Sequence, residues 1–325
     1  MIARRAGAAL AVGLLLLVAL GDRIAPNSAM QQFHDSAWAP PMSLRLSGGD
    51  LYAHPLRLSD RLARTFTEDA SRRVDVDLFA RGRLVAADPG GGGPVLLFGA
   101  DALGRDILAR VAGAARWSLG VALAGALLAI LVGALLGAAA ASNGRLIDRL
   151  VVSTSTTIAS LPVVYVVLAL RASLPLVMSP GQVFAALTLL FGAVGWPMTA
   201  WGMRGILLRE RALDYAEAAR AAGASRARLL FVHLLPASSG FLVTQVLILV
   251  PGFLIAEVTL SFLGLGFPEP TPSWGTMLQE ASTVRVVAEA PWMLAPAAAI
   301  ALTSIALQLA AGRRSDPLTV FSRGR

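Results

Sequence analysis

Six long apolar segments constrain the fold of this 325-residue chain more than any other feature. They cover approximately residues 2–20, 117–141, 150–170, 182–203, 237–263 and 291–311. Each is long enough to cross the roughly 30 Å hydrocarbon core of a bilayer as a helix of about 20 residues. An open strand in lipid would leave its backbone polar groups without partners. The sequence therefore predicts an all-α membrane protein with about six transmembrane helices.

Composition supports this class and excludes several chemistries. Hydrophobic residues make up 56% of the chain and charged residues only 15%, which is too apolar for a soluble domain. The absence of cysteine excludes disulfides, thiolate catalysis and cysteine-bound zinc. All 28 basic residues are arginine, so a P-loop and Schiff-base chemistry, which need lysine, are excluded too. We therefore expect no enzyme activity, no metal and no cofactor bound by this chain.

The arginines indicate the orientation in the membrane. One set comprises Arg145, Arg149, Arg204, Arg209, Arg211, Arg220, Arg226, Arg228, Arg313, Arg314, Arg323 and Arg325. If the spans alternate in direction, all of these fall on one side, which the positive-inside rule assigns to the cytoplasm. The short connections on the other side carry only Arg171 and Arg285. The formal charge of +8 thus reflects membrane topology, and we expect no nucleic-acid partner.

Residues 22–98 form a long polar segment, predicted to be external (periplasmic) and inserted between helices 1 and 2, because long loops are exported largely regardless of charge. It is expected to be either a small folded module or a solvated spacer. Residues 74–79 and 83–86 are predicted to pair as a hairpin, and residues 90–93 to form a flexible hinge. The first transmembrane helix (residues 1–21) is favoured as a retained anchor over a cleaved signal peptide. A core over 99–312 and a cytoplasmic tail over 313–325 complete the predicted organisation.

The predicted cytoplasmic loop between the fourth and fifth spans has a specific spacing. Its candidate functional residues are Glu217, Ala218, Ala219, Gly223, Leu235 and Pro236. Strong helix formers precede Gly223, and Ser225 is a candidate N-cap for a second short helix. Pro236 falls in the first turn of the fifth span, where its missing N–H costs nothing. The loop is predicted to form two short helices joined at Gly223, with an alanine face that another protein can approach closely.

Two further sequence motifs accompany the loop motif. Residues 101–110 read DALGRDILAR, and residues 256–266 read AEVTLSFLGLG, followed by PTPSWGTML at 270–278. Together with the loop, they resemble the C-type permease subunit of dipeptide, oligopeptide and nickel ATP-binding-cassette (ABC) importers, over about residues 98–312. The chain departs from that pattern at Ala100, where threonine is usual, at Ala237, where asparagine is common, and in the tail after Gly312.

The resemblance implies a multi-pass protein of the bacterial inner (cell) membrane that forms a translocation path for peptides or similar small solutes. It implies three kinds of partner besides the lipid bilayer: a second permease subunit in a heterodimer, two ABC ATPase subunits that use ATP, and an external solute-binding protein. The loop from Glu217 to Gly223 would transmit ATPase movement during alternating access.

Asp101, Arg105, Asp106 and Glu257 are candidate gate or outer-interface residues. The first three are expected to cap and pair on a short interfacial helix. Glu257 lies about 20 residues past Pro236, or roughly 30 Å along a helix, and is therefore expected near the outer interface. Solute contact, snorkelling at the rim and a structural role beside the outer loop all remain open for it.

Two other classes of function were considered. An ion-coupled secondary transporter, with a broken helix at Pro251 and Gly252, would carry buried acids at mid-membrane, and none is clearly placed there. An intramembrane hydrolase using Ser225 and His233 is excluded, because both residues fall in the cytoplasmic loop.

Overall fold

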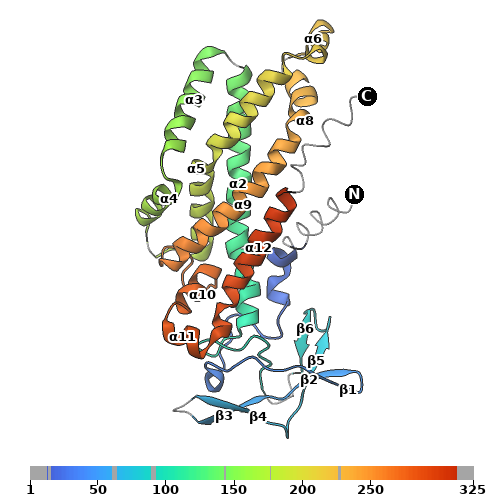
Figure 1. The fold of residues 1–325 in the computed structure, drawn as a ribbon, viewed down its shortest axis with the longest axis vertical. Coiled ribbons are helices and arrows are strands. Elements are labelled where there is room, and N and C mark those ends of the chain that lie inside the picture. Colours follow the sequence, from blue (N-terminus) through green and yellow to red (C-terminus); the bar gives the residue numbers. More distant parts are fainter. Residues whose placement is uncertain are drawn as a thin grey trace. The chain divides into compact units, whose positions relative to one another are not determined.

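The computed structural model describes residues 13, 16–60, 64–88, 93–142, 144–175, 177–225 and 228–312 (Figure 1). The chain divides into two units. Unit 1 comprises Met1–Gly120 and Glu257–Ala306, and unit 2 comprises Val121–Ala256 and Leu307–Arg325. Three helices contribute residues to both units: α2 (Ile107–Ser142), α9 (Ser239–Phe262) and α12 (Ala295–Gly312).

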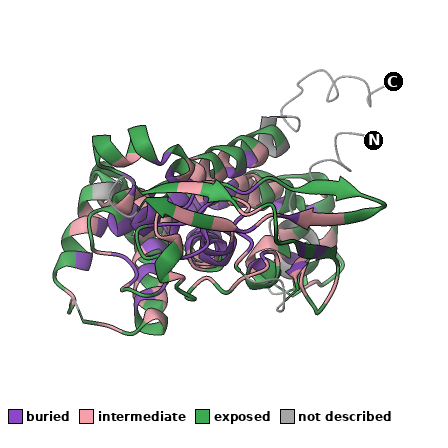
Figure 2. Ribbon diagram, turned by 90° about the horizontal axis from the view of Figure 1, so that it is seen from below, coloured by how far each residue is buried: buried purple, intermediate pink, exposed green. Residues whose placement is uncertain are grey.

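Unit 1 contains six short strands. They are β1 (Arg45–Ser47), β2 (Asp50–Ala53), β3 (Leu56–Asp60), β4 (Thr65–Glu68), β5 (Val74–Leu78) and β6 (Val85–Ala87). One sheet has the order β1-β2-β5-β6 and the other pairs β3 with β4, all antiparallel. The predicted hairpin is confirmed, because Val76 pairs with Ala87 and Leu78 with Val85. In Figure 2 the arrows are largely green and pink, since few strand residues are buried.

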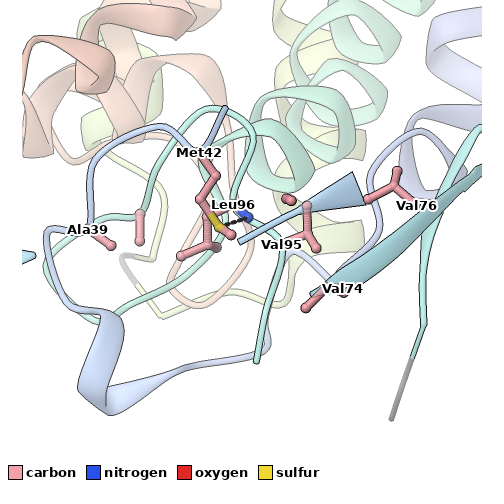
Figure 3. Close-up of a cluster of buried hydrophobic side chains, with 8 residues drawn as sticks. Ala39, Met42, Val74, Val76, Val95 and Leu96 are labelled. Carbon is pink, nitrogen blue, oxygen red and sulfur yellow. Dashed lines mark hydrogen bonds between the residues drawn. The ribbon is translucent and has the colours of Figure 1, made fainter. Parts of the chain in front are cut away.

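The strands enclose a small apolar core, which Figure 3 shows in close-up. Its buried members are Ala39, Met42, Ala53, Val74, Val76, Val95, Leu96 and Ala100. Val74 and Val76 alternate with exposed residues along β5, as a half-buried strand requires. The backbone N–H of Leu96 donates to Met42 Sδ over 3.1 Å, which ties the segment before α2 to the segment before β1. This part of the chain is therefore a folded module rather than a spacer. The predicted hinge lies largely outside the described residues.

The remaining elements of unit 1 are short. They are η1 (Gly21–Arg23), η2 (His34–Ser36), α10 (Trp274–Glu280), α11 (Val284–Glu289) and η4 (Pro291–Leu294). The sequence predicted a separate interfacial helix before the second span, and this is wrong. Asp106 instead caps a single helix, α2, whose 36 residues include the end of the motif and the whole predicted span.

Unit 2 is helical. Besides its parts of α2, α9 and α12 it contains α3 (Arg145–Ser160), α4 (Val163–Ala172), α5 (Pro180–Glu210), α6 (Asp214–Ala221), the π-helical turn η3 (Leu229–Leu234) and α8 (Leu235–Ala237). The predicted third span is not one helix, because α3 and α4 are bent by 88° at the break between them. Leu161 precedes Pro162 and is extended, with φ −83° and ψ 138°, as steric contact with the proline ring favours.

Helices α2 and α5 approach closely within unit 2. A Cβ added to Gly133 would lie 2.6 Å from the carbonyl oxygen of Trp196, and one added to Gly137 would lie 2.5 Å from that of Ala200. Small residues at such positions bring helix backbones together where lipid provides no hydrophobic driving force. The contact therefore depends on these two glycines.

Four described helices are long and apolar enough to cross a membrane, or five if the bent pair counts as one span. Leu127, Leu131 and Leu135 of α2 are each more than half exposed and recur every fourth residue, which forms an apolar stripe along the helix. A stripe of this kind suits contact with lipid. The predicted first span lies largely outside the described residues, so the total of six helices remains a prediction.

Candidate functional site

The loop between α5 and α9 forms a short helix with two different faces. Ala216 of α6 is fully buried in a cluster with Ala138 and Ala141 of α2 and with Leu207 of α5. Ala219 and Leu235 pack partly against the same cluster. On the other face, Glu217 and Ala218 are exposed, and so is Pro236 after η3. Of the six sequence-predicted residues, this arrangement partly buries two and leaves the other four exposed and open to a partner.

Gly223 ends this helix in a backbone conformation that suits glycine. Its φ is +84°, within the left-handed region that side chains resist. Nothing lies within 4 Å of a Cβ built there, so only the dihedral angle opposes substitution. Ser225 follows as predicted, and its Oγ accepts the backbone N–H of Arg228 over 3.2 Å.

Hydrogen bonds fasten α6 to the helices beside it. The guanidinium of Arg220 donates to the carbonyl of Arg211 over 2.6 Å, and the Tyr215 hydroxyl donates to Glu210 Oε2 over 2.9 Å. Arg211 also donates to the carbonyl of Ala141, near the end of α2. The Glu217–Arg220 ion pair, at 4.0 Å, is exposed. The loop is therefore attached to the ends of α5 and α2 rather than being a free linker.

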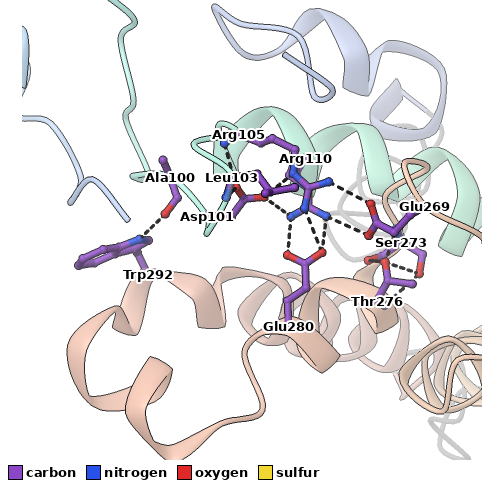
Figure 4. Close-up of polar contacts among 10 residues, drawn as sticks. All are labelled: Ala100, Asp101, Leu103, Arg105, Arg110, Glu269, Ser273, Thr276, Glu280 and Trp292. Carbon is purple, nitrogen blue, oxygen red and sulfur yellow. Dashed lines mark hydrogen bonds and ion pairs between the residues drawn. The ribbon is translucent and has the colours of Figure 1, made fainter. Parts of the chain in front are cut away.

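Unit 1 contains a second polar cluster, built on two buried arginines (Figure 4). We call it the arginine cluster; its members are Asp101, Arg105, Arg110, Glu269 and Glu280. Asp101 Oδ2 lies 2.6 Å from Arg105 Nε and 2.5 Å from Arg110 Nη1. Arg110 also donates to both oxygens of Glu280, at 2.6 and 2.7 Å. Three carboxylates thus neutralise two buried guanidinium groups.

Helix α10 presents Glu280 to this cluster because its first residue is anchored on α2. The backbone N–H of Trp274 donates to Ser118 Oγ over 3.1 Å, and its indole Nε1 donates to the carbonyl of Val111 over 2.9 Å. Ser273 caps the helix through a reciprocal pair of bonds with Thr276. Glu280 lies at the other end of the helix, where it reaches the first turn of α2.

The four predicted outer residues do not form one site. Asp101 and Arg105 join the arginine cluster, whereas Asp106 caps α2 and accepts a hydrogen bond from the amide of Asn27 over 2.9 Å. Glu257 is fully buried and accepts the hydroxyl of Ser261 over 2.6 Å. Among the described residues, no hydrogen bond or ion pair connects Glu257 to the arginine cluster.

Sequence reasoning missed Arg110, Glu269 and Glu280 as members of the cluster. Arg110 was visible as the last residue of the DALGRDILAR motif, but no local spacing connects it to Glu280, which is 170 residues away. The signal that was available is the occurrence of two arginines five residues apart at the start of an apolar helix.

Burial and neighbouring charges raise the pKa values of two of these groups, for different reasons. Burial alone would lower the pKa of the Arg105 guanidinium, but the charges of Asp101 and Glu280 outweigh it and raise the pKa, so Arg105 stays protonated. Burial raises the pKa of Asp106 to about 6, although the amide of Asn27 and two backbone N–H groups oppose the shift. Asp106 is therefore the group here that titrates near neutral pH.

Comparison with known proteins agrees with this architecture. The family described as "Binding-protein-dependent transport system inner membrane component" matches residues 129–314, more than half of the chain. A Brucella ovis protein with a provisional peptide-permease name is 35% identical over 211 residues, which are 65% of this chain and 68% of that one. The dipeptide transport system permease protein DppC of Bacillus subtilis is 33% identical over 225 residues, 68% of this chain and 67% of its own. The oligopeptide permease protein OppC of Haemophilus influenzae is 34% identical over 61% of each chain. This chain belongs to the family of inner-membrane components of binding-protein-dependent transport systems.

Proposed function

We propose that this chain is the transmembrane permease subunit of an ABC importer, and that the loop around Glu217–Gly223 couples it to ATPase subunits. The observation that carries the proposal is the two-faced helix α6. Ala216 is buried against α2 and α5, whereas Glu217 and Ala218 on the same short helix are exposed. A partner that pushes on the exposed face moves the membrane helices directly.

The contacts around α6 support this mechanical role. Arg220 and Tyr215 hold the helix to the end of α5, and Arg211 joins that end to α2. Pro197 within α5 is a point at which this helix can flex. An ion pair from Arg204 of α5 to Asp148 keeps the helix attached to α3. We propose that movement of α6 changes the packing of α3, α5 and α9 in alternating access.

The partners follow from what this chain lacks and from its relatives. Without lysine it cannot form the P-loop that binds nucleotide phosphates, and in this proposal two ABC ATPase subunits supply ATP hydrolysis. A second permease subunit would complete the path, and an external binding protein would deliver the solute. The relatives named as dipeptide and oligopeptide permeases favour peptides or similar small solutes as cargo.

Reconstitution tests the proposal. The purified chain alone should show no ATPase activity, whereas proteoliposomes that contain the chain, its partner permease and the ATPase subunits should take up peptide only with ATP and binding protein. A protonophore should leave this uptake unchanged. Uptake that continues without the ATPase subunits and stops with the protonophore would instead identify an ion-coupled secondary transporter.

A further inference from the structure

Unit 1 contains a cavity of about 450 Å³ that shares no lining residue with the arginine cluster. Its walls include Trp38, Arg64, Phe66, Arg285, Glu289 and Trp292. Trp38 follows η2, Arg64 and Phe66 flank the start of β4, and the other three residues come from α11 and η4. The volume falls within the range of sites for small ligands, which are mostly apolar with a few fixed polar groups.

The wall that carries the two tryptophans is fixed in place. The backbone N–H of Trp38 donates to the carbonyl of Asp101 over 2.9 Å, and the indole Nε1 of Trp292 donates to that of Ala100 over 3.0 Å (Figure 4). A Cβ on Gly99 would lie 2.9 Å from the Trp292 ring, so glycine permits this contact. The indole of Trp292 and the backbone of Trp38 are therefore held before any ligand arrives, which lowers the entropic cost of binding.

The charges around the cavity do not balance. Arg285 pairs with Glu289 over 3.0 Å, but Arg64 pairs with no carboxylate among the residues that the structure describes. The three ionisable side chains that line the cavity thus leave one positive charge uncompensated. Arginine suits the recognition of a carboxylate because its planar guanidinium can donate two parallel hydrogen bonds.

Two of the lining residues have unusual backbones. Trp38 has φ +63° and Arg64 has φ +50°, in the left-handed region that residues other than glycine rarely adopt. Such strain persists only where the surrounding structure enforces it, and it concentrates at ligand sites. Here it occurs at one of the aromatic residues and at the unpaired cation.

We propose that this cavity binds a small carboxylate that carries an aromatic or large apolar side chain, such as the C-terminal residue of a short peptide. Arg64 pairs with the carboxylate, and Trp38, Phe66 and Trp292 surround the side chain. Binding at this site is additional to the translocation path, and it does not require that this chain transports peptides or couples to an ATPase.

Saturation-transfer NMR on the purified full chain in lipid nanodiscs, without ATP, tests the proposal with the dipeptide Gly-Phe as probe. Gly-Phe should bind saturably, and its C-terminal amide, which lacks the carboxylate, should bind roughly tenfold more weakly. Arg64→Ala should weaken Gly-Phe binding by a similar factor and leave binding of the amide unchanged. Among the residues that the structure describes, the exposed Arg64 side chain makes no ion pair, so this variant should keep its fold.

Arg57→Ala is the matched control, because Arg57 is an exposed arginine of β3 that does not line the cavity. It should bind Gly-Phe as the wild type does. Trp38→Leu should weaken Gly-Phe and its amide alike, because it removes aromatic contact and not charge. Equal binding of Gly-Phe and its amide, an Arg64→Ala variant that binds like the wild type, or no saturable binding at millimolar peptide would each overturn the proposal.

Discussion

At the scale of single residues, we expect a large stability cost if Arg110 is changed. Its side chain is buried and bonded to Asp101 and Glu280. Removing one partner from a buried ionic group leaves the other charges without compensation, at a cost of about 3–5 kcal/mol. We expect Arg110→Ala to lower the free energy of unfolding by an amount in this range, which thermal unfolding in detergent would measure.

Arg285→Ala is the control for that measurement. The Arg285 and Glu289 side chains are 82% and 64% exposed, and exposed ion pairs typically contribute about 0–1 kcal/mol. This variant should unfold close to the wild-type temperature. Equal destabilisation by the two substitutions would mean that burial of the arginine cluster does not matter.

The raised pKa of Asp106 leads us to expect that the stability of the protein depends on pH. Its pKa is about 6 in the folded protein against an ordinary value of 3.8, so folding favours the protonated form. At a pH below both pKa values, Asp106 is neutral in the folded and in the unfolded protein. At a pH above both pKa values, the folded protein must bury the charged carboxylate. The free energy of unfolding should therefore fall by up to about 3 kcal/mol as the pH rises from about 4 to about 6.

Asp106→Asn isolates this contribution, because asparagine keeps the size and an acceptor oxygen but cannot ionise. The unfolding temperature of the variant relative to the wild type should increase as the pH rises through that interval. A difference that stays constant with pH would show that Asp106 does not titrate there.

At the scale of elements, the turn after α6 gives the sharpest test of coupling. Gly223→Val places a β-branched residue at φ +84°, which costs about 1–2 kcal/mol, while the space around it is open. We expect near-normal expression and membrane insertion, loss of transport, and reduced recovery of ATPase subunits in pull-down assays.

Gly144→Val provides the matched comparison. Gly144 has φ +91°, also with nothing within 4 Å of a built Cβ, but it precedes α3 and lies outside the α6 segment. The same backbone strain should leave ATPase recovery intact there. Should both variants or neither lose the ATPase subunits, the segment around Gly223 would have no special role in docking.

At the scale of the whole molecule, the absence of cysteine makes the topology directly measurable. Ala221→Cys, on exposed α6, and Ala70→Cys, on the exposed loop after β4, introduce single thiols. In intact spheroplasts, a membrane-impermeant maleimide should label Ala70→Cys only, and permeabilised cells should show labelling of both. Labelling of Ala221→Cys in intact spheroplasts would reverse the predicted orientation.

Features encoded by continuous segments of sequence could be predicted. Apolar runs located α5, α9 and α12, and the alternation of Val74 and Val76 predicted the hairpin. Strand β1 has three exposed residues and no alternation, so its pairing was not visible. Pro162 indicated a kink, but the bend of 88° depends on how α4 packs, which a local pattern does not determine.

The same distinction between local and long-range features applies to the candidate site. Gly223 and Ser225 could be placed from spacing, because the end and the cap of a helix are determined by neighbouring residues. The arginine cluster could not, since Arg110 and Glu280 are joined only by the tertiary fold.

That separation has a consequence for biosynthesis. A ribosome that adds about 5–20 residues per second needs roughly 10–30 s to translate the 170 residues between Arg110 and Glu280. During this interval the nascent α2 has one of its carboxylate partners already, because Asp101 is only nine residues away. Asp101 can thus pair with Arg110 from the start and stays paired in the finished fold, and Glu280 completes the pairing only when the last part of the chain has been made.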